Sequence, residues 1–106
     1  MDMKKKYIKN SAIYSNEPFE IYYLINNYAK WSPRKTYYDS DEIYVRLKDL
    51  KSKWPPEKKA YLVWFKNIEF HSTTLYTLQE LVSVSEMKKI DSSDVGTLYS
   101  IGTKNQ

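Results

Sequence analysis

The only histidine of the chain, His71, lies two residues after Glu69 and directly before Ser72, Thr73 and Thr74. A carboxylate that orients an imidazole beside a hydroxyl group is typical of hydrolases, and on a strand Glu69 and His71 would share a face. Such a site also needs a shaped nucleophile turn and an oxyanion hole, and no glycine lies near these residues. We therefore interpret the pair as a surface feature and predict no catalytic residue.

Metal and nucleotide chemistry also lack their usual residues. The absence of cysteine and the single histidine exclude the common zinc sites. Asp39, Asp41 and Glu42 lie close together, but the glycine of a calcium loop is missing, and carboxylates suit the first turn of a helix. Both glycines, Gly96 and Gly102, come late in the chain, so no glycine-rich loop can cradle a phosphate. We expect no metal, no cofactor and no small-molecule substrate.

Basic residues mixed with aromatic ones form the most informative pattern. Residues 30–66 carry ten Lys or Arg against five Asp or Glu, in a chain of net charge +4. Lysines that contact phosphates and aromatic rings that stack on bases are the requirements of sequence-tolerant nucleic-acid binding, while two arginines leave little capacity for bidentate base recognition. We predict that a nucleic acid or an acidic partner contacts Lys30, Arg34, Lys35, Tyr37, Tyr38, Arg46, Lys51, Lys53, Lys58 and Lys59. The alternative is that lysine stems cover the edges of a buried apolar stripe.

A second candidate surface suits a protein partner. The outer side of a helix expected after Asn16 would present Phe19, Tyr23 and Asn27, an aromatic and amide mixture that is common in protein contacts. Eleven tyrosines exceed what a core of this size can bury, because each buried hydroxyl needs a partner. Trp64 is a further protein-contact candidate, because it would face away from the most apolar side of its strand.

Two helices are expected in the first half of the chain. After a first strand over residues 6–15, Asn16 offers an N-cap and Pro18 suits the first turn of a helix. The core side of that helix would consist of Ile21, Leu24, Ile25 and Tyr28. Asp39 and Glu42 have capping-box spacing for a second helix, which the Pro55-Pro56 pair ends. Its apolar stripe would consist of Ile43, Leu47, Leu50 and Trp54, although the alternation over residues 43–47 leaves a strand as the alternative.

The apolar stretch over residues 60–66 predicts a strand that returns over residues 68–72 as a hairpin. Val63 and Phe65 would then lie in the core, and Trp64 would lie on the opposite face, partly covered. A helix through the same stretch is the alternative, because apolar residues also recur there at helical spacing.

Thr77 and Glu80 form a capping box for a third helix, and residues 97–101 suit a last short strand. The resulting order, β-α-α-β-β-α-β, predicts an α+β fold in which a small, mainly antiparallel sheet packs against two or three helices.

Length and composition fit one globular domain over residues 1–106. The lack of cysteine fits a reducing compartment, Lys9 and Asn10 break the apolar stretch that a signal peptide needs, and no apolar run is long enough to span a membrane. We expect a cytoplasmic protein with no membrane partner. Frequent Lys, Asn, Ile and Tyr indicate an AT-rich coding sequence, such as that of a bacterium or a phage.

Three functions fit the sequence. The first is a small non-catalytic module that binds a nucleic acid or a nucleic-acid-bound complex through its Lys/Tyr-rich surface. The alternative is an inhibitor or adaptor, encoded by a phage or mobile element, that binds a host enzyme as anti-CRISPR proteins do. The third, a small basic ribonuclease toxin that uses His71 and Glu69, rests on analogy at the level of the fold.

Overall fold

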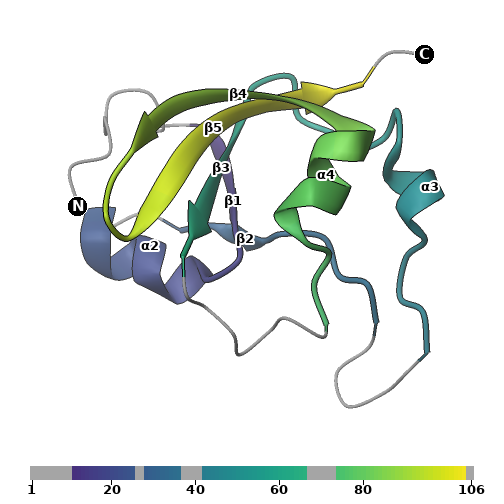
Figure 1. The fold of residues 1–106 in the computed structure, drawn as a ribbon, viewed down its shortest axis with the longest axis horizontal. Helices are drawn as coiled ribbons and strands as arrows, with labels where there is room; N and C mark the ends of the chain where they lie inside the picture. The colour runs from purple at the N-terminus through teal and green to yellow at the C-terminus, as the bar shows by residue number, and fades with distance from the viewer. Residues whose placement is uncertain (1–10, 26–27, 37–41, 67–73, 105–106) are drawn as a thin grey trace.

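The computed structural model describes residues 11–25, 28–36, 42–66 and 74–104. Five strands form one sheet in the order β2-β1-β3-β5-β4 (Figure 1). The strands are β1 (Ala12–Ser15), β2 (Lys30–Trp31), β3 (Ala60–Phe65), β4 (Ser85–Ser92) and β5 (Gly96–Thr103). The helices are α2 (Pro18–Ile25), α3 (Leu47–Leu50) and α4 (Leu78–Val84). The α+β fold predicted from the sequence is therefore confirmed.

The sheet is mixed and not mainly antiparallel as predicted, and β3 lies at its centre. β1 pairs with β2 and with β3 in parallel, while β5 pairs with β3 and with β4 in antiparallel orientation. Because β1 and β5 occupy both edges of β3, the predicted hairpin between residues 60–66 and 68–72 is wrong, although residues 68–72 themselves lie outside the described part of the chain. A strand covered on both faces is apolar on both, which explains the continuous run AYLVWF in β3.

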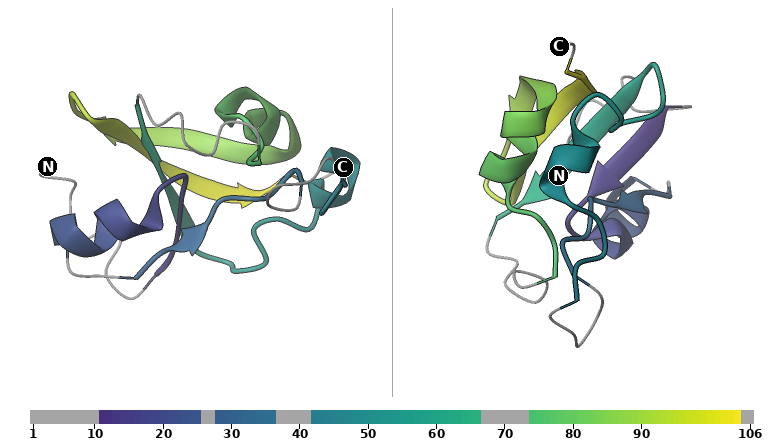
Figure 2. Two further views of the ribbon diagram at one scale, coloured as in Figure 1. Left: turned by 90° about the horizontal axis from the view of Figure 1, so that it is seen from below. Right: turned by 90° about the vertical axis from the view of Figure 1, so that its right-hand side faces the viewer.

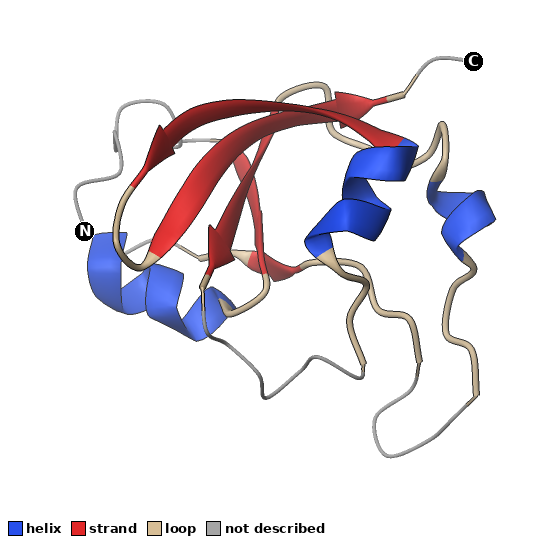
Figure 3. Cartoon of the chain, in the orientation of Figure 1, coloured by secondary structure: helices blue, strands red, loops and turns tan. Residues whose placement is uncertain are grey.

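Helices cover both faces of the sheet, with α2 on one side and with α3 and α4 on the other (Figures 2 and 3). Ile21 of α2 packs against Val63 and Phe65, whereas Trp64 is partly buried in the cluster under α3 and α4. Val63 and Phe65 are buried, and Trp64 is half-buried on the opposite face. The predicted orientation of these three side chains is thus confirmed.

Helix α2 begins at Pro18 as expected, but Asn16 is not its N-cap. The Asn16 side chain instead bonds the backbone of Phe65, with Nδ2 donating to the carbonyl at 2.9 Å and Oδ1 accepting from the N–H at 2.8 Å. A side-chain amide has the same donor and acceptor as a peptide group, so Asn16 continues the pairing between β1 and β3. Tyr28, predicted in the core, lies beyond the helix and is 80% exposed.

The second helix of the prediction is wrong for most of its length, because only the single turn α3 forms. Residues 42–46 form no helix: they contain bends, and Ile43 is 50% exposed and forms an isolated bridge with Thr36. The Tyr76 hydroxyl donates to the Val45 carbonyl, a contact between residues far apart in the sequence that ties this segment to the domain. Asp39, the predicted cap, lies outside the described residues.

The last part of the chain contains the predicted helix α4, the predicted last strand β5, and one strand, β4, that the sequence pattern did not predict. The capping box of α4 is confirmed, since Thr77 Oγ1 accepts from the Glu80 N–H at 3.2 Å and the Glu80 carboxylate accepts from the Thr77 N–H at 2.9 Å. β4 follows α4 directly, lies at the edge of the sheet and reads SEMKKIDS. Edge strands carry charged residues, so such a sequence gives little hydrophobic signal.

β5 begins where two backbones approach closely. Gly96 pairs with Phe65, and a Cβ atom at Gly96 would lie 2.6 Å from the Trp64 carbonyl oxygen. A Cβ atom at Gly102, in the same strand, would have no atom within 4 Å.

Candidate functional site

Exposed positive charge is concentrated in residues 46–59, which we term the basic segment. It contains six Lys or Arg and two Asp or Glu, a net charge of +4 that equals the formal net charge of the whole chain. Its basic side chains are all exposed, and none forms an ion pair with a described residue. They are Arg46, Lys48, Lys51, Lys53, Lys58 and Lys59. Five of the six were predicted, and Lys48 was missed because the expected helix placed it away from the flanks of the apolar stripe.

Two buried apolar side chains hold the basic segment against the domain. Leu50 and Trp54 are buried in the cluster that also contains Leu81 of α4. The Leu50 carbonyl accepts hydrogen bonds from the Lys53 and Trp54 N–H groups at 3.0 and 2.9 Å, which closes a tight turn between these anchors. The intervening Ser52 has a φ of 71°, and its hydroxyl donates to the Lys104 carbonyl at 3.3 Å. The lysines on this turn therefore project from a fixed backbone.

Lys30, predicted as a binding residue, is paired within the protein. Its Nζ lies 2.8 Å from Oε2 of Glu57 and 5.7 Å from the centre of the Tyr14 ring. The Tyr14 hydroxyl donates to Oε1 of the same carboxylate at 2.9 Å. This cluster connects β1 and β2 to the end of the basic segment. Because the Glu57 carboxylate offsets its charge, Lys30 attracts an anionic ligand less strongly than an unpaired lysine would.

The cluster shifts two pKa values. Burial, and then the Glu57 carboxylate, raise the pKa of the Tyr14 hydroxyl well above its ordinary value. Burial also opposes the charge of Glu57, but hydrogen bonds from Lys30, the backbone and Tyr14 outweigh it and leave the pKa of Glu57 below its ordinary value. The cluster thus consists of the ion pair of Lys30 with Glu57 and a hydrogen bond that the Tyr14 hydroxyl donates to the same carboxylate.

Arg34 and Lys35 extend the positive surface beyond the basic segment. Arg34 is half-buried, with its guanidinium 6.0 Å from the centre of the Tyr44 ring, whereas Lys35 is exposed. The Lys35 carbonyl accepts from the Tyr44 N–H at 3.0 Å, which places Lys35 beside the segment that leads to Arg46. Tyr37 and Tyr38 lie outside the described residues.

A second surface consists of exposed aromatic rings on α2 and beside β2. Phe19 is 65% exposed and Tyr28 80% exposed, and Tyr22 and half-buried Trp31 complete what we term the aromatic patch. The Phe19 and Trp31 rings are 6.3 Å apart and nearly perpendicular, and the Tyr22 and Tyr28 rings are 5.1 Å apart.

Of the predicted protein contacts on α2, the structure describes only the Phe19 side chain, because the Tyr23 side chain and Asn27 lie outside the described part. The sequence did not indicate Tyr22, Tyr28 or Trp31. No sequence signal identified Tyr28 and Trp31, because their exposure depends on α2 ending at Ile25, before Tyr28.

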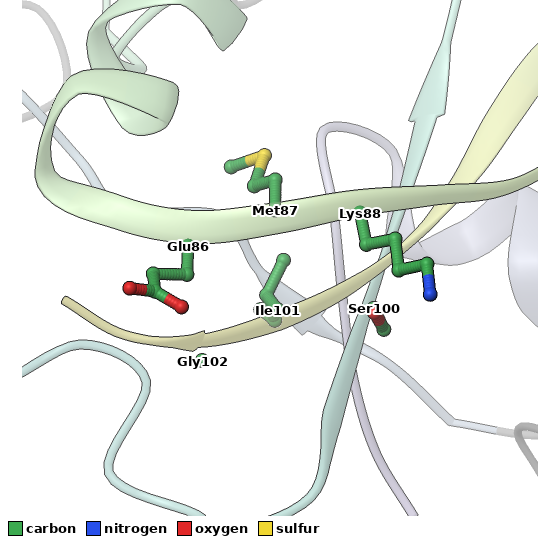
Figure 4. A pocket seen from close by; sticks show the side chains of 6 residues that line it. All are labelled: Glu86, Met87, Lys88, Ser100, Ile101 and Gly102. Atoms are coloured by element: carbon green, nitrogen blue, oxygen red, sulfur yellow. The ribbon is translucent and has the colours of Figure 1, made fainter.

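A shallow pocket of about 290 Å³ lies on the outer strand pair β4 and β5. Figure 4 shows Glu86 and Lys88 on one strand and Ser100, Ile101 and Gly102 on the other. Its charged groups are the Glu86 carboxylate and the Lys88 ammonium group. Within the described ranges no three His, Cys, Asp or Glu side chains gather as a metal site, and Glu69 and His71 fall outside those ranges.

None of the helices in the described residues has the length and apolar character to cross a membrane. Comparisons of the chain with protein-family models, with curated proteins and with solved structures found no match.

Proposed function

We propose that the protein is a non-catalytic binding module, acting in the cytoplasm, whose basic segment contacts the phosphate backbone of a nucleic acid or of a nucleic-acid-bound complex. One observation carries this proposal: six exposed cations lie within fourteen residues, and none forms an ion pair with a described residue. Unpaired cations that do not stabilise the fold are available to an anionic partner.

The expected mode of binding follows from the types of these side chains. Lysines act as point charges that neutralise phosphates and release counterions, which gives affinity without reading a sequence. Arg34 is engaged with the Tyr44 ring, so Arg46 is the arginine best placed for a bidentate contact. Binding should therefore depend strongly on salt and weakly on base sequence.

Salt titration with two matched double variants tests the proposal. Lys51→Gln/Lys53→Gln removes two charges from the basic segment, and Lys88→Gln/Lys89→Gln removes two exposed charges from β4, at the far edge of the sheet. The affinity for labelled DNA and RNA oligonucleotides is measured by fluorescence anisotropy over a series of salt concentrations. We expect the first variant to flatten the plot of log affinity against log salt by up to about two, since each phosphate contact contributes about one to the slope, and the second to leave the slope unchanged.

Two results would contradict the proposal. Equal effects of the two variants would show that only net charge matters and that the basic segment is not the contact. No binding of DNA or RNA at low salt, where charges are least screened, would defeat nucleic-acid binding and favour the inhibitor or adaptor of a host protein.

A further inference from the structure

The outer edge of β4 is open to a further strand. β4 is the last strand of the sheet and pairs with β5 on one side and with no described strand on the other. The backbone N–H and C=O groups of such an edge can pair with a strand of another chain. β4 is eight residues long, whereas β2 at the opposite edge has only two. We infer that β4 pairs with β4 of a second copy of this chain, which joins two sheets edge to edge in a symmetric dimer. This inference goes beyond the proposed function and does not rest on it.

The charges on β4 are accessible to such a partner. Glu86 and Lys88 lie on one face of the strand and Met87 lies on the other, where it packs against the cluster under α3 and α4 (Figure 4). Both charged side chains are exposed, and neither forms an ion pair or a hydrogen bond with a described residue. Gly102, which lies opposite Glu86 on β5, has no side chain that could cover them.

Twofold symmetry restricts how two β4 strands can pair. The axis is perpendicular to the joined sheet, so the strands are antiparallel and one residue lies opposite its own copy. A register centred on Glu86, Lys88 or Lys89 places two like charges opposite each other, which is unfavourable. A register centred on Met87 instead places Glu86 of each copy opposite Lys88 of the other. The sequence Glu-Met-Lys is therefore complementary to itself in this register.

The regular part of β4 has the same centre. Residues Ser85 to Lys89 pair with β5 in unbroken register, and the register then shifts between Lys89 and Asp91. On the other side, α4 ends at Val84, immediately before the strand. Met87 is the middle residue of this regular part, so the register centred on it pairs Ser85 with Lys89 of the copy and uses the regular part completely. A shifted register would include the irregular positions or the end of α4 and would lose ladder hydrogen bonds.

The expected dimer is reversible, because the paired part of β4 is short. We expect a Kd of about 10 to 100 µM, at the weak end of specific protein contacts. Sedimentation equilibrium without nucleic acid measures it at protein concentrations up to about 0.5 mM, where a Kd of about 100 µM leaves most chains in dimers.

Charge reversal tests both the dimer and its register. Glu86→Lys leaves two positive charges on this face of β4 and Lys88→Glu leaves two negative ones, so each variant alone opposes like charges and should be monomeric. An equimolar mixture of the two variants should dimerise, because a positive strand then lies opposite a negative one. The double variant Glu86→Lys/Lys88→Glu should also dimerise, because it exchanges the two charges and retains their complementarity.

Lys89→Glu is the matched control. It reverses an exposed charge on the same strand, but its position lies opposite Ser85 of the copy, so its dimer should be about as stable as that of the unchanged protein. Circular dichroism spectra and Tm values of all variants check that each one is folded.

Three results would overturn the inference. If the charges of β4 served only to keep its edge unpaired, the unchanged protein would stay monomeric at the highest concentration. A dimer that neither single reversal weakens would form through another surface. Folded single variants that remain monomeric when mixed would show that Glu86 and Lys88 do not face each other across the axis.

Discussion

Replacing Gly96 with alanine should destabilise the protein, because the added methyl group has no room between β5 and β3. The new Cβ would lie 2.6 Å from the Trp64 carbonyl oxygen and 3.2 Å from the Phe65 Cα. Both atoms belong to the backbone of the central strand, so no side-chain rotation can relieve the contact.

The size of the effect follows from this geometry. Ordinary contact begins at 3.4 Å, so the two strands must separate by about 0.8 Å at the paired positions. Overpacking of this kind costs about 1 to 3 kcal/mol, of which the lower conformational entropy of the unfolded alanine chain offsets about 0.4 to 1 kcal/mol. The net loss of about 1 to 2 kcal/mol corresponds to a fall in Tm of about 5 to 15 °C for a domain of this size.

Thermal unfolding followed by circular dichroism measures this difference. Gly102→Ala is the control, because its Cβ meets no atom within 4 Å and neither glycine has a positive φ. Its Tm should stay the same or rise by a few degrees, through the effect on the unfolded chain alone. Equal Tm values for the two variants would refute the argument, since they would show that β3 and β5 do not approach closely at Gly96.

Four further substitutions test other parts of the structure. The pKa of Glu57 is held below its ordinary value of 4.5, so the Glu57 carboxylate stabilises the fold above that pH. This stabilisation is lost as the pH falls through the lower pKa of the folded state. Glu57→Gln should therefore lose less stability in acid than the unchanged protein does, as measured by urea midpoints from pH 7 to 3. Phe65→Ala should cost about 3 to 5 kcal/mol and half-buried Trp64→Ala clearly less, as measured by urea unfolding, and the reverse order would contradict the described burial. Tyr76→Phe should cost about 0.5 to 1.5 kcal/mol in the same assay, through the lost part-buried hydrogen bond to the Val45 carbonyl, and no loss would mean that this bond does not form.

Local signals in the sequence were sufficient where the structure depends on neighbouring residues. The capping box at Thr77 and Glu80 predicted the start of α4, and Pro18 predicted the start of α2. The alternation in residues 60–65 predicted the faces of β3, because side chains alternate along any strand whatever its partners are.

Predictions failed where distant contacts decide the structure. Leu50 and Trp54 are buried as the helical stripe required, yet residues 42–46 are not helical, because contacts with Tyr76 and Thr36 outweigh a weak local preference for a helix. The partners of β3 also depend on the whole topology, which no local pattern encodes.

The same distinction between local and distant signals applies to the candidate site. The charge of a side chain does not depend on the secondary structure of its backbone, so most of the basic segment could be predicted although the expected helix is mostly absent. The exposure of Tyr28 and Trp31 depends on where α2 ends and on the two-residue strand β2, and neither was predictable from periodicity. The pairing of Lys30 with Glu57 joins positions far apart in the chain and required the structure.

The parallel pairing of β1 with β3 has a consequence for the order of folding. Ala12 lies opposite Ala60, 48 positions later, so β1 has to wait for β3 before any sheet partner exists on that side. Contacts this distant close large loops and form slowly, whereas β4 and β5 are adjacent in the sequence and can pair early.

During synthesis, the half of the chain that carries both candidate surfaces therefore emerges first, but the strands that hold it in place pair with it last. The aromatic patch and the basic segment end at residue 59, immediately before β3, and β3 in turn needs β5 on its other edge. A fragment that stops at residue 59 would hold every cation and ring of the two surfaces without the sheet that arranges them.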